Sequence, residues 1–330
     1  MHRILVVGTG SIGDRHVRCM LNTKRAAVGI CEINDPLRGE VAERYEIRES
    51  FAAVREAMKA QWDAAVIATP AHIHIPIALQ LAGADVNLLI EKPLSTTTEG
   101  VESLMERVKK RGLVAAVAYV YRAHPALAAM KEALHSGRFG RPLQVVTTSG
   151  QNFPINRPAY REIYYADRTM GGGAIQDAIT HVLNACEWLL GPIDRLVADA
   201  AHQLLEGVEV EDTVHLISRH GDVMGCHSLN QYQHADEMTI TVVCSRGVLR
   251  FEMHEGRWRW KSGPLGDWQN QAVPQLERDD WFTVQENAFL DALEGKTEPL
   301  CTLEQGLQTL KVNLAALRSA DGALVWQTIE

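Results

Sequence analysis

Apolar and polar positions follow two different patterns along the chain, and the first third keeps one of them throughout. Short, continuously apolar runs recur there, as expected of parallel strands that are buried on both faces of a sheet. These runs are residues 4–7, 27–31, 64–68, 86–90 and 114–119. The stretches between them have helical periodicity, from residue 13 and at residues 36–45, 75–82 and 98–111. This alternation of strand and helix predicts a doubly wound parallel sheet and an α/β fold.

After about residue 121 the pattern changes. A helix at 125–136 and a strand at 143–149 lead into a polar, aromatic loop at 151–168. Strand candidates separated by short turns then follow one another, at residues 195–204, 210–219, 223–231, 238–244, 247–253 and 257–261. Closely spaced strands of this kind predict an antiparallel or mixed sheet. With two helices at 281–293 and 303–319, residues 122–330 are expected to form an α+β domain after a first domain of residues 1–121.

Composition narrows the possible partners. The chain has 330 residues, which suits two domains, and a formal net charge of -8, which gives no basic surface for nucleic acid. Its six cysteines have no CxxC spacing, which argues against a zinc site or a disulfide framework and fits a reducing cytosol. The first apolar run is too short for a signal peptide or a membrane span. We therefore expect a cytoplasmic protein that binds neither nucleic acid nor membrane.

The segment Gly8-Thr9-Gly10-Ser11-Ile12-Gly13 follows the first strand and opens a helix. Glycines at these spacings allow a tight turn, close approach of the backbone to a pyrophosphate, and close packing of the helix. Glu32 ends the second strand, 19 residues after Gly13, where a carboxylate accepts hydrogen bonds from the ribose hydroxyls. Glu32 favours NAD over NADP, although Arg38 or Arg15 could still reach a 2′-phosphate. The motif predicts a Rossmann domain.

Two further segments carry reactive side chains. Lys92 lies in Glu91-Lys92-Pro93 at the end of the strand at 86–90. Asp177 and His181 follow the glycine run 171–173, and because they are four residues apart they share one face of a helix. A lysine and a His/Asp pair beside a dinucleotide site form a proton relay suited to hydride transfer. The alternatives are a buried structural histidine and a surface lysine at a strand end.

Several stretches together resemble the glucose-fructose oxidoreductase / inositol dehydrogenase (Gfo/Idh/MocA) family. They cover roughly the first 190 residues, and they are GTGSIGDRH, ATPAHIHIPIALQLAG, EKP, YRAHPAL, SGRFGRP and GGGAIQDAITH. The resemblance implies Lys92, Asp177 and His181 as the catalytic set. It also implies a Rossmann domain followed by a domain with a large open sheet, which packs sheet to sheet in homodimers or homotetramers.

The resemblance sets a further group of residues beside the cofactor. Together with the glycine loop and Glu32 these are Thr69, Pro70, His74, Glu91 and Lys92. His72 and His74 alternate as metal ligands could, but no third ligand is placed and we expect no metal. A group of aromatic and basic residues either lines a polyhydroxylated or anionic substrate or anchors a long loop. They are Tyr121, Arg122, Arg157, Tyr160, Tyr164, Tyr165 and Arg168. Asn184 stands where the family often has an aspartate that binds sugar or orients the histidine.

The sequence thus predicts an NAD-dependent oxidoreductase acting on a CH–OH group of a sugar, sugar nucleotide or cyclitol. His181 would accept the hydroxyl proton, Asp177 would orient substrate or tune His181, and Lys92 would stabilise the alkoxide. The alternatives are a non-catalytic NAD(P)-sensing regulator on the same scaffold, or a glycosidase-like enzyme that recycles tightly bound NAD.

The apolar alternation along the strands of the second domain predicts an assembly of subunits. Val210, Val214, Leu216 and Val223 are expected to leave a sheet face that a second subunit covers. Trp258 and Trp260 alternate on a strand whose face is expected at a subunit interface rather than in a sugar platform.

Overall fold

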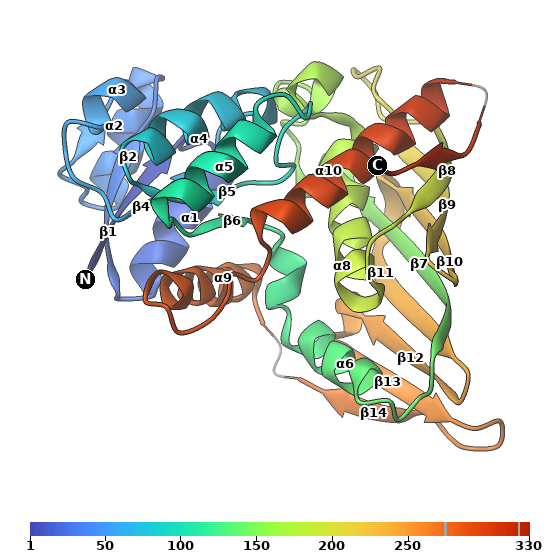
Figure 1. The fold of residues 1–330 in the computed structure, drawn as a ribbon. Coiled ribbons are helices and arrows are strands. Elements are labelled where there is room, and N and C mark those ends of the chain that lie inside the picture. The colour runs from blue at the N-terminus through green and yellow to red at the C-terminus, as the bar shows by residue number, and fades with distance from the viewer. Residues whose placement is uncertain (274–275, 323) are drawn as a thin grey trace. The chain divides into compact units, whose positions relative to one another are not determined.

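The computed structural model describes residues 1–273, 276–322 and 324–330, and the chain separates into two compact units (Figure 1). The first unit comprises Met1–Ala123 and Leu276–Leu307, and the second comprises His124–Gln275 and Gln308–Glu330. The sequence suggested two continuous segments divided after residue 121. The division instead returns residues 276–307 to the first unit, because a helix in that stretch packs against the first sheet.

The first unit holds a parallel sheet in the strand order β3-β2-β1-β4-β5-β6, with six strands among the described residues. Its strands are β1 (His2–Val7), β2 (Ala26–Cys31), β3 (Ser50–Phe51), β4 (Ala64–Ile67), β5 (Asn87–Ile90) and β6 (Ala115–Val117). The register aligns Val6 with Ile30 on one side and with Val66 on the other. The predicted doubly wound sheet is confirmed, and the strand order reverses between β1 and β4, where such folds bind their ligands.

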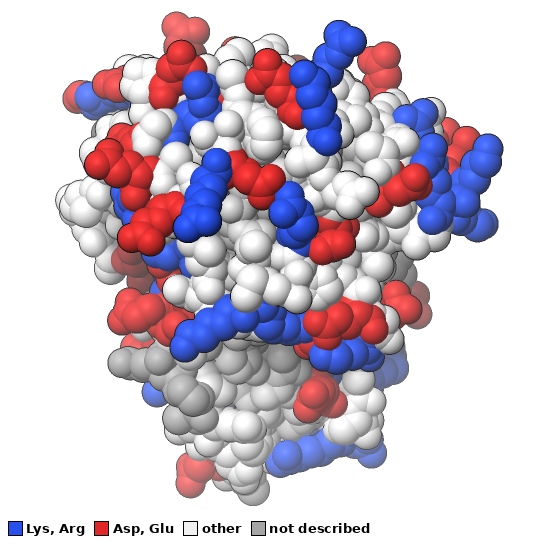
Figure 2. All heavy atoms as spheres, turned by 90° about the vertical axis from the view of Figure 1, so that its left-hand side faces the viewer, with Lys and Arg blue, Asp and Glu red and all other residues white. Residues whose placement is uncertain are grey.

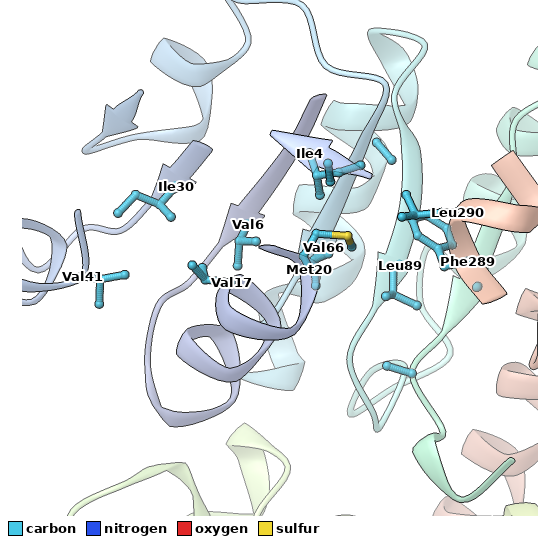
Figure 3. Packing of buried hydrophobic residues seen from close by; sticks show 14 residues of the cluster. Ile4, Val6, Val17, Met20, Ile30, Val41, Val66, Leu89, Phe289 and Leu290 are labelled. Carbon is cyan, nitrogen blue, oxygen red and sulfur yellow. The ribbon is translucent and has the colours of Figure 1, made fainter. Parts of the chain in front are cut away.

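Helices cover both faces of this sheet (Figure 1). They are α1 (Ser11–Asn22), α2 (Asp35–Arg44), α3 (Val54–Ala57), α4 (His74–Gly83), α5 (Val101–Arg111) and α9 (Arg278–Leu293). Val17 and Met20 of α1 pack with Phe289 and Leu290 of α9 against the strand residues of one face (Figure 3). Phe289 is 2% exposed and Leu290 is fully buried, so α9 completes the core of the first unit.

The second unit holds a mixed sheet, whose described strands number nine and run in the order β14-β13-β12-β11-β7-β10-β9-β8-β15. Among the described strand pairs of this second sheet, only β7–β10 is parallel. The strands are β7 (Pro142–Asn152), β8 (Arg195–Ala201), β9 (Thr213–His220), β10 (Val223–Asn230), β11 (Tyr232–Cys244), β12 (Gly247–Glu252), β13 (Arg257–Ser262), β14 (Gln269–Ala272) and β15 (Gln327–Thr328). This confirms the predicted α+β domain with a large mixed sheet.

One face of the second sheet is covered by helices of the same chain. They are α6 (Pro125–His135), α8 (Thr180–Leu190) and α10 (Leu303–Asp321) (Figure 1). Val214, Leu216 and Val223 are at most 8% exposed, and so is Val210, which packs with Phe153. The prediction that these residues leave a face uncovered is wrong, because they point toward the core. The opposite face presents Ile217, Met224 and Cys226 to solvent.

The two tryptophans of β13 also pack inside the chain. Trp258 is 3% exposed, and its ring stacks on Trp260 with centroids 4.6 Å apart. The guanidinium of Arg138 lies 5.0 Å from the Trp260 ring. This face of β13 is therefore covered by the same subunit, which differs from the expected subunit interface.

Charged side chains of both signs are interspersed on the face drawn in Figure 2. In the first unit, helix α1 carries an ion pair between Arg18 and Asp14, at 2.9 Å. Interspersed charges of this kind leave little net field over the coloured residues of that face. Within the described part of the chain, no helix is both long and apolar enough to cross a membrane.

Candidate active site

The glycine loop joins β1 to α1 in the first unit. Gly8 has a φ of +84°, and a Cβ on Gly13 would lie 1.9 Å from the carbonyl oxygen of Gly8, so neither position accommodates a side chain. A Cβ on Gly10, by contrast, would meet no described atom within 4 Å. Gly10 is also the N-cap of α1, whose first residues are Ser11 and Ile12. The loop therefore offers open space and free backbone N–H groups at a helix N-terminus, which suits a pyrophosphate.

Glu32 lies at the end of β2 with its carboxylate turned toward this loop. Its Oε2 accepts a hydrogen bond from the backbone N–H of Thr9 at 2.8 Å, and its Oε1 accepts one from Asn34 at 2.9 Å. Arg38 donates to the carbonyl oxygen of Glu32 at 2.8 Å and also pairs with Asp35. Arg15 is paired with Asp279 at 2.9 Å. Both arginines that could meet a 2′-phosphate thus already pair with a carboxylate.

His74 connects the segment that follows β4 to the segment that follows β5. The His74 ring is 1% exposed, with Nε2 2.7 Å from the carbonyl oxygen of Thr69 and Nδ1 3.1 Å from that of Pro93. Burial lowers the pKa of His74, and its hydrogen bonds to the two backbone carbonyl oxygens oppose that shift. Thr69 in turn touches the glycine loop, since its methyl carbon would lie 3.1 Å from a Cβ on Gly8. His74 therefore joins two segments of the expected cofactor site and is not arranged as a metal ligand.

Lys92 follows β5, and its backbone is fixed by the preceding residue. Glu91 is 4% exposed, and its Oε2 accepts a hydrogen bond from the Lys92 N–H at 3.0 Å. The other carboxylate oxygen, Oε1, lies 2.8 Å from Nε2 of the buried His16 on α1. Glu91 thus connects the lysine to the helix that starts at the glycine loop.

Asp177 and His181 lie in the second unit, on a helix that begins differently from the expected α-helix. Residues Ile175–Ile179 are π-helical and lead into α8, so Asp177 lies in the π-helical turn and His181 is the second residue of α8. Such turns are frequent at functional sites. A Cβ on Gly173 would lie 2.5 Å from Oε1 of the buried Glu211, and that carboxylate accepts the N–H of Ile175 at 3.1 Å. Glu211 therefore fixes the entrance to this turn.

The Asp177 carboxylate is 4% exposed and contacts the loop at 151–168. Tyr164 donates its hydroxyl to Oδ1 at 2.7 Å, and Arg157 Nη1 lies 3.8 Å from Oδ2. Arg157 also donates to the Tyr164 oxygen at 3.3 Å. This arrangement of hydrogen-bond donors around a carboxylate acceptor can bind hydroxyl groups of a substrate.

The remaining substrate candidates have structural contacts. Tyr160 is buried and donates to the carbonyl oxygen of Glu206 at 2.7 Å, so it anchors the loop. Arg168 pairs with Glu211 and Asp321 at 2.8 Å each. Asn184 is 1% exposed and donates to Thr309 on α10 at 2.9 Å.

Tyr121 and Arg122 lie in a short 3-10 helix, Val120–Ala123, of the first unit. Tyr121 packs beside Ile12 against the cluster of Cys19, Val120 and Phe282. Arg122 is 3% exposed and donates to the carbonyl oxygen of Leu300 at 2.9 Å. Tyr121 therefore lies near the glycine loop, whereas Arg122 braces the end of the first unit.

Sequence reasoning missed His16, Glu286, Glu211 and the contact between Tyr164 and Asp177. His16 lies three residues after Gly13, whereas Glu286 lies on a helix 270 residues further along the chain. No local sequence pattern therefore relates the two. A histidine inside an otherwise ordinary amphipathic helix was the available signal for His16. Within the described residues no group of three or more His, Cys, Asp or Glu is arranged to hold a metal ion.

Comparisons with known proteins match both parts of the chain. Residues 2–119 match the model of an oxidoreductase family with an NAD-binding Rossmann fold, and residues 127–250 match the GFO/IDH/MocA C-terminal domain. A levoglucosan dehydrogenase of Pseudarthrobacter phenanthrenivorans is 32% identical over 49% of this chain and 42% of its own. A scyllo-inositol 2-dehydrogenase (NAD(+)) of Bacillus subtilis is 28% identical over 57% of this chain and 54% of its own. The matches thus span about half the length of these curated relatives.

The fold as a whole also has close counterparts. A solved structure of a levoglucosan dehydrogenase in complex with NADH superposes with a TM-score of 0.91 at 20% identity, covering 100% of this chain and 99% of that one. At this identity the likeness establishes the fold. It includes both sheets, since the aligned region covers the whole chain.

Proposed function

Because the chain belongs to the GFO/IDH/MocA family of oxidoreductases, we propose that it is an NAD-dependent dehydrogenase of sugars, sugar nucleotides or cyclitols. The observation that carries the proposal is the glycine loop, open at Gly10 and flanked by the Glu32 carboxylate, in a chain that also has Lys92, Asp177 and His181. When bound, NAD supplies the hydride acceptor. The chain's own side chains would bind the alcohol and accept its proton.

The residues around the loop fit NAD. The N–H groups at the start of α1 would hold the pyrophosphate, and the space beside Gly10 admits it. Glu32 would accept hydrogen bonds from the ribose hydroxyls and repel a 2′-phosphate. Thr69 touches the loop at Gly8, and His74 holds the Thr69 carbonyl oxygen. Pro70, which follows Thr69, would border the cofactor. NADP is the less favoured cofactor because Arg38 and Arg15 are already paired with carboxylates.

We propose that His181 is the base that accepts the proton of the substrate hydroxyl. Oxidation of a secondary alcohol requires a base for the hydroxyl proton as hydride leaves the carbon, and a half-buried histidine is suited to it. Lys92 would stabilise the oxygen as negative charge develops on it. Asp177, held by Tyr164, would orient the substrate hydroxyls or tune His181.

The substrate class follows from the donors and acceptors around Asp177. Tyr164, Arg157 and Asp177 are polar side chains in mutual contact, and they would bind hydroxyl groups of a substrate rather than an apolar one. The names of the relatives, a levoglucosan and an inositol dehydrogenase, support a polyhydroxylated ring.

A screen tests this proposal directly. We would mix the protein and NAD with levoglucosan, scyllo-inositol, D-xylose and UDP-N-acetylglucosamine and follow NADH absorbance. Reduction of NAD by at least one of these compounds is expected. Tight NAD binding without turnover on any sugar or cyclitol would instead favour a cofactor-sensing regulator.

We also propose that the chain forms a homodimer or homotetramer in the cytoplasm. The solvent-facing side of the second sheet carries Ile217 and Met224, exposed by 46% and 48%, with Cys226 between them in the sheet. Adjacent apolar residues on a broad flat sheet favour burial against another subunit. The six cysteines show no CxxC spacing, which fits a reducing compartment.

A further inference from the structure

A chain of three ionisable side chains is buried inside the first unit. His16 on α1 has Nδ1 2.5 Å from Oε1 of Glu286 on α9, and Nε2 2.8 Å from Oε1 of Glu91 after β5. The side chains of His16 and Glu286 are fully buried, and that of Glu91 is 5% exposed. Their hydrogen bonds therefore operate without competition from water.

The geometry requires a proton on each side of the ring. A neutral imidazole has one N–H, so a carboxylate at the second nitrogen would face a lone pair unless a further proton lies between them. One N–H thus donates to Glu91, and a second proton lies in the short contact with Glu286. Burial alone would lower the pKa of His16, but Glu286 and Glu91 outweigh it and raise the pKa to about 10. The extra proton is retained at neutral pH.

Stability alone does not account for this arrangement. Replacing a buried ionic group by apolar side chains of similar volume is often neutral or stabilising, so buried ionic groups are weak evidence of a stabilising role. Here the Oε2 atom of Glu286 is buried and has no hydrogen-bond partner among the described residues. Burying this carboxylate oxygen without a partner costs stability, so the buried chain of three side chains is better explained by the residue that it positions.

What it positions is the backbone of Lys92. Glu91 accepts from His16 through Oε1 and from the Lys92 N–H through Oε2, at 3.0 Å. On the other side of the lysine, the Pro93 carbonyl oxygen lies 3.1 Å from the His74 ring. His16 itself is on α1, which begins at the glycine loop.

We propose that His16 is a positioning residue for Lys92, acting through Glu91 and held by Glu286. The three side chains fix the lysine relative to the helix that carries the cofactor loop. This inference rests on the proposed dehydrogenase function, in which Lys92 stabilises the reacting oxygen.

The first test uses the protein without substrate. His16→Gln should speed hydrogen exchange of the Lys92 amide by about tenfold or more, because Glu91 loses its partner and releases that N–H. Arg25→Gln is the matched control. Arg25 also attaches α9, through Asp291 and Glu294 at 2.8 and 2.9 Å, but contacts neither His16 nor Glu91 among its described hydrogen bonds. It should leave the exchange of the Lys92 amide unchanged.

The second test measures turnover with a compound that the screen identifies. His16→Gln should lower kcat by about tenfold or more while the Kd for NAD, measured by calorimetry, stays within about twofold. In a Lys92→Ala background, His16→Gln should change kcat by less than about twofold, since its effect passes through the lysine. Arg25→Gln should keep the wild-type kcat.

The outcomes separate the two proposals. An equal loss of kcat from His16→Gln with and without Lys92, or unchanged exchange of the Lys92 amide, would overturn the positioning role alone. Normal turnover of Lys92→Ala would overturn the proposed catalytic lysine and this inference with it. If His16→Gln does not fold, His16→Asn replaces it, because the shorter amide cannot reach Glu286 and Glu91 at the same time. The same results are then expected and the same results contradict the proposal.

Discussion

At the scale of single residues, Glu32 is expected to decide the cofactor. Its carboxylate is anchored by the N–H groups of Thr9 and Asn34, so it cannot swing away from an incoming 2′-phosphate without losing both bonds. We expect tighter binding of NAD than of NADP. Glu32→Gln should narrow the difference in binding free energy between NAD and NADP by about 1.5–3 kcal/mol, the range for a hydrogen bond to a charged group. Calorimetry with both cofactors measures it.

Glu43→Ala provides the control for that measurement. Glu43 is exposed on α2 in the same unit. Its replacement changes the net charge by as much as Glu32→Gln does, but it leaves the contacts of the glycine loop intact. Its ratio of NAD to NADP affinity should match that of the wild type. Equal affinities of the wild-type protein for the two cofactors would refute the role of Glu32.

The proposed proton relay predicts large kinetic effects with intact cofactor binding. His181→Ala and Lys92→Ala should each lower kcat by about 10²-fold or more, since one removes the base and the other the charge beside the reacting oxygen. Both should bind NAD nearly as the wild type does, because neither residue lies in the glycine loop. The fall in rate toward acid pH should disappear in His181→Ala.

Tyr164 offers a graded comparison with these variants. Tyr164→Phe removes the hydroxyl that donates to Asp177, and Asp177→Asn removes the charge that accepts it. Each should reduce kcat less than His181→Ala does if Asp177 only orients or tunes. Normal turnover by both alanine variants on the true substrate would show that the relay is wrong.

The residues that could be recognised from the sequence are those whose role depends on neighbours close in the chain. The glycines and Glu32 were predictable because a turn, a helix start and a strand end impose fixed spacing on them. His16 and Glu286 were not, since their contact joins positions 270 residues apart. Tyr164 and Tyr160 could not be told apart either. One donates to Asp177 and the other to the Glu206 backbone, and only the loop's path decides this.

At the scale of secondary-structure elements, His227 links three strands of the second sheet. From β10 it contacts Thr147 of β7 at 3.0 Å and Ser218 of β9 at 2.9 Å. Burial lowers its pKa from 6.5 to about 3. A lowered pKa means that the unfolded chain takes up the proton first, so stability present above about pH 6.5 is lost as the pH falls toward 3.

Equilibrium unfolding at several pH values measures this loss. Between pH 6 and 4, His227→Gln should reduce the slope of the unfolding free energy against pH by about 1.4 kcal/mol per pH unit, which corresponds to one proton. His215→Gln is the control, because His215 is exposed on the neighbouring strand β9. It should keep the wild-type slope, and a His227 variant that also kept it would exclude this explanation.

The elements themselves were predictable where periodicity was strong and less so elsewhere. The parallel strands of the first unit and the long strands of the second were found from their apolar patterns. The short edge strands β3, β14 and β15 were missed, since two to four residues carry too little pattern. The π-helical turn at Asp177 was also missed, because residue type there does not distinguish it from an α-helix.

At the scale of the whole molecule, both sheets follow from the sequence, but the membership of α9 and the exposed sheet face do not. Helix α9 follows strands β7 to β14 of the second sheet in sequence, yet its residues Phe289 and Leu290 complete the core of the first unit (Figure 3). The alternation of apolar and polar residues along β9 and β10 shows that one face of the sheet is more apolar than the other. It does not show that the more apolar one is already covered by helices of the same chain.

The exposed face of that sheet gives the last prediction. Ile217 and Cys226 are aligned on adjacent strands, and Met224 lies beside them, all on the side that the helices leave uncovered. A second copy of the chain would bury this surface, so light scattering should give twice or four times the 36.6 kDa of one chain. Met224→Glu should shift the mass toward that of a monomer, because a buried interface disfavours an unpaired charge. Val284→Glu, at an exposed apolar position on α9, should leave the mass unchanged. A wild-type protein that remains monomeric at micromolar concentration would contradict the proposed assembly and leave this face for another partner.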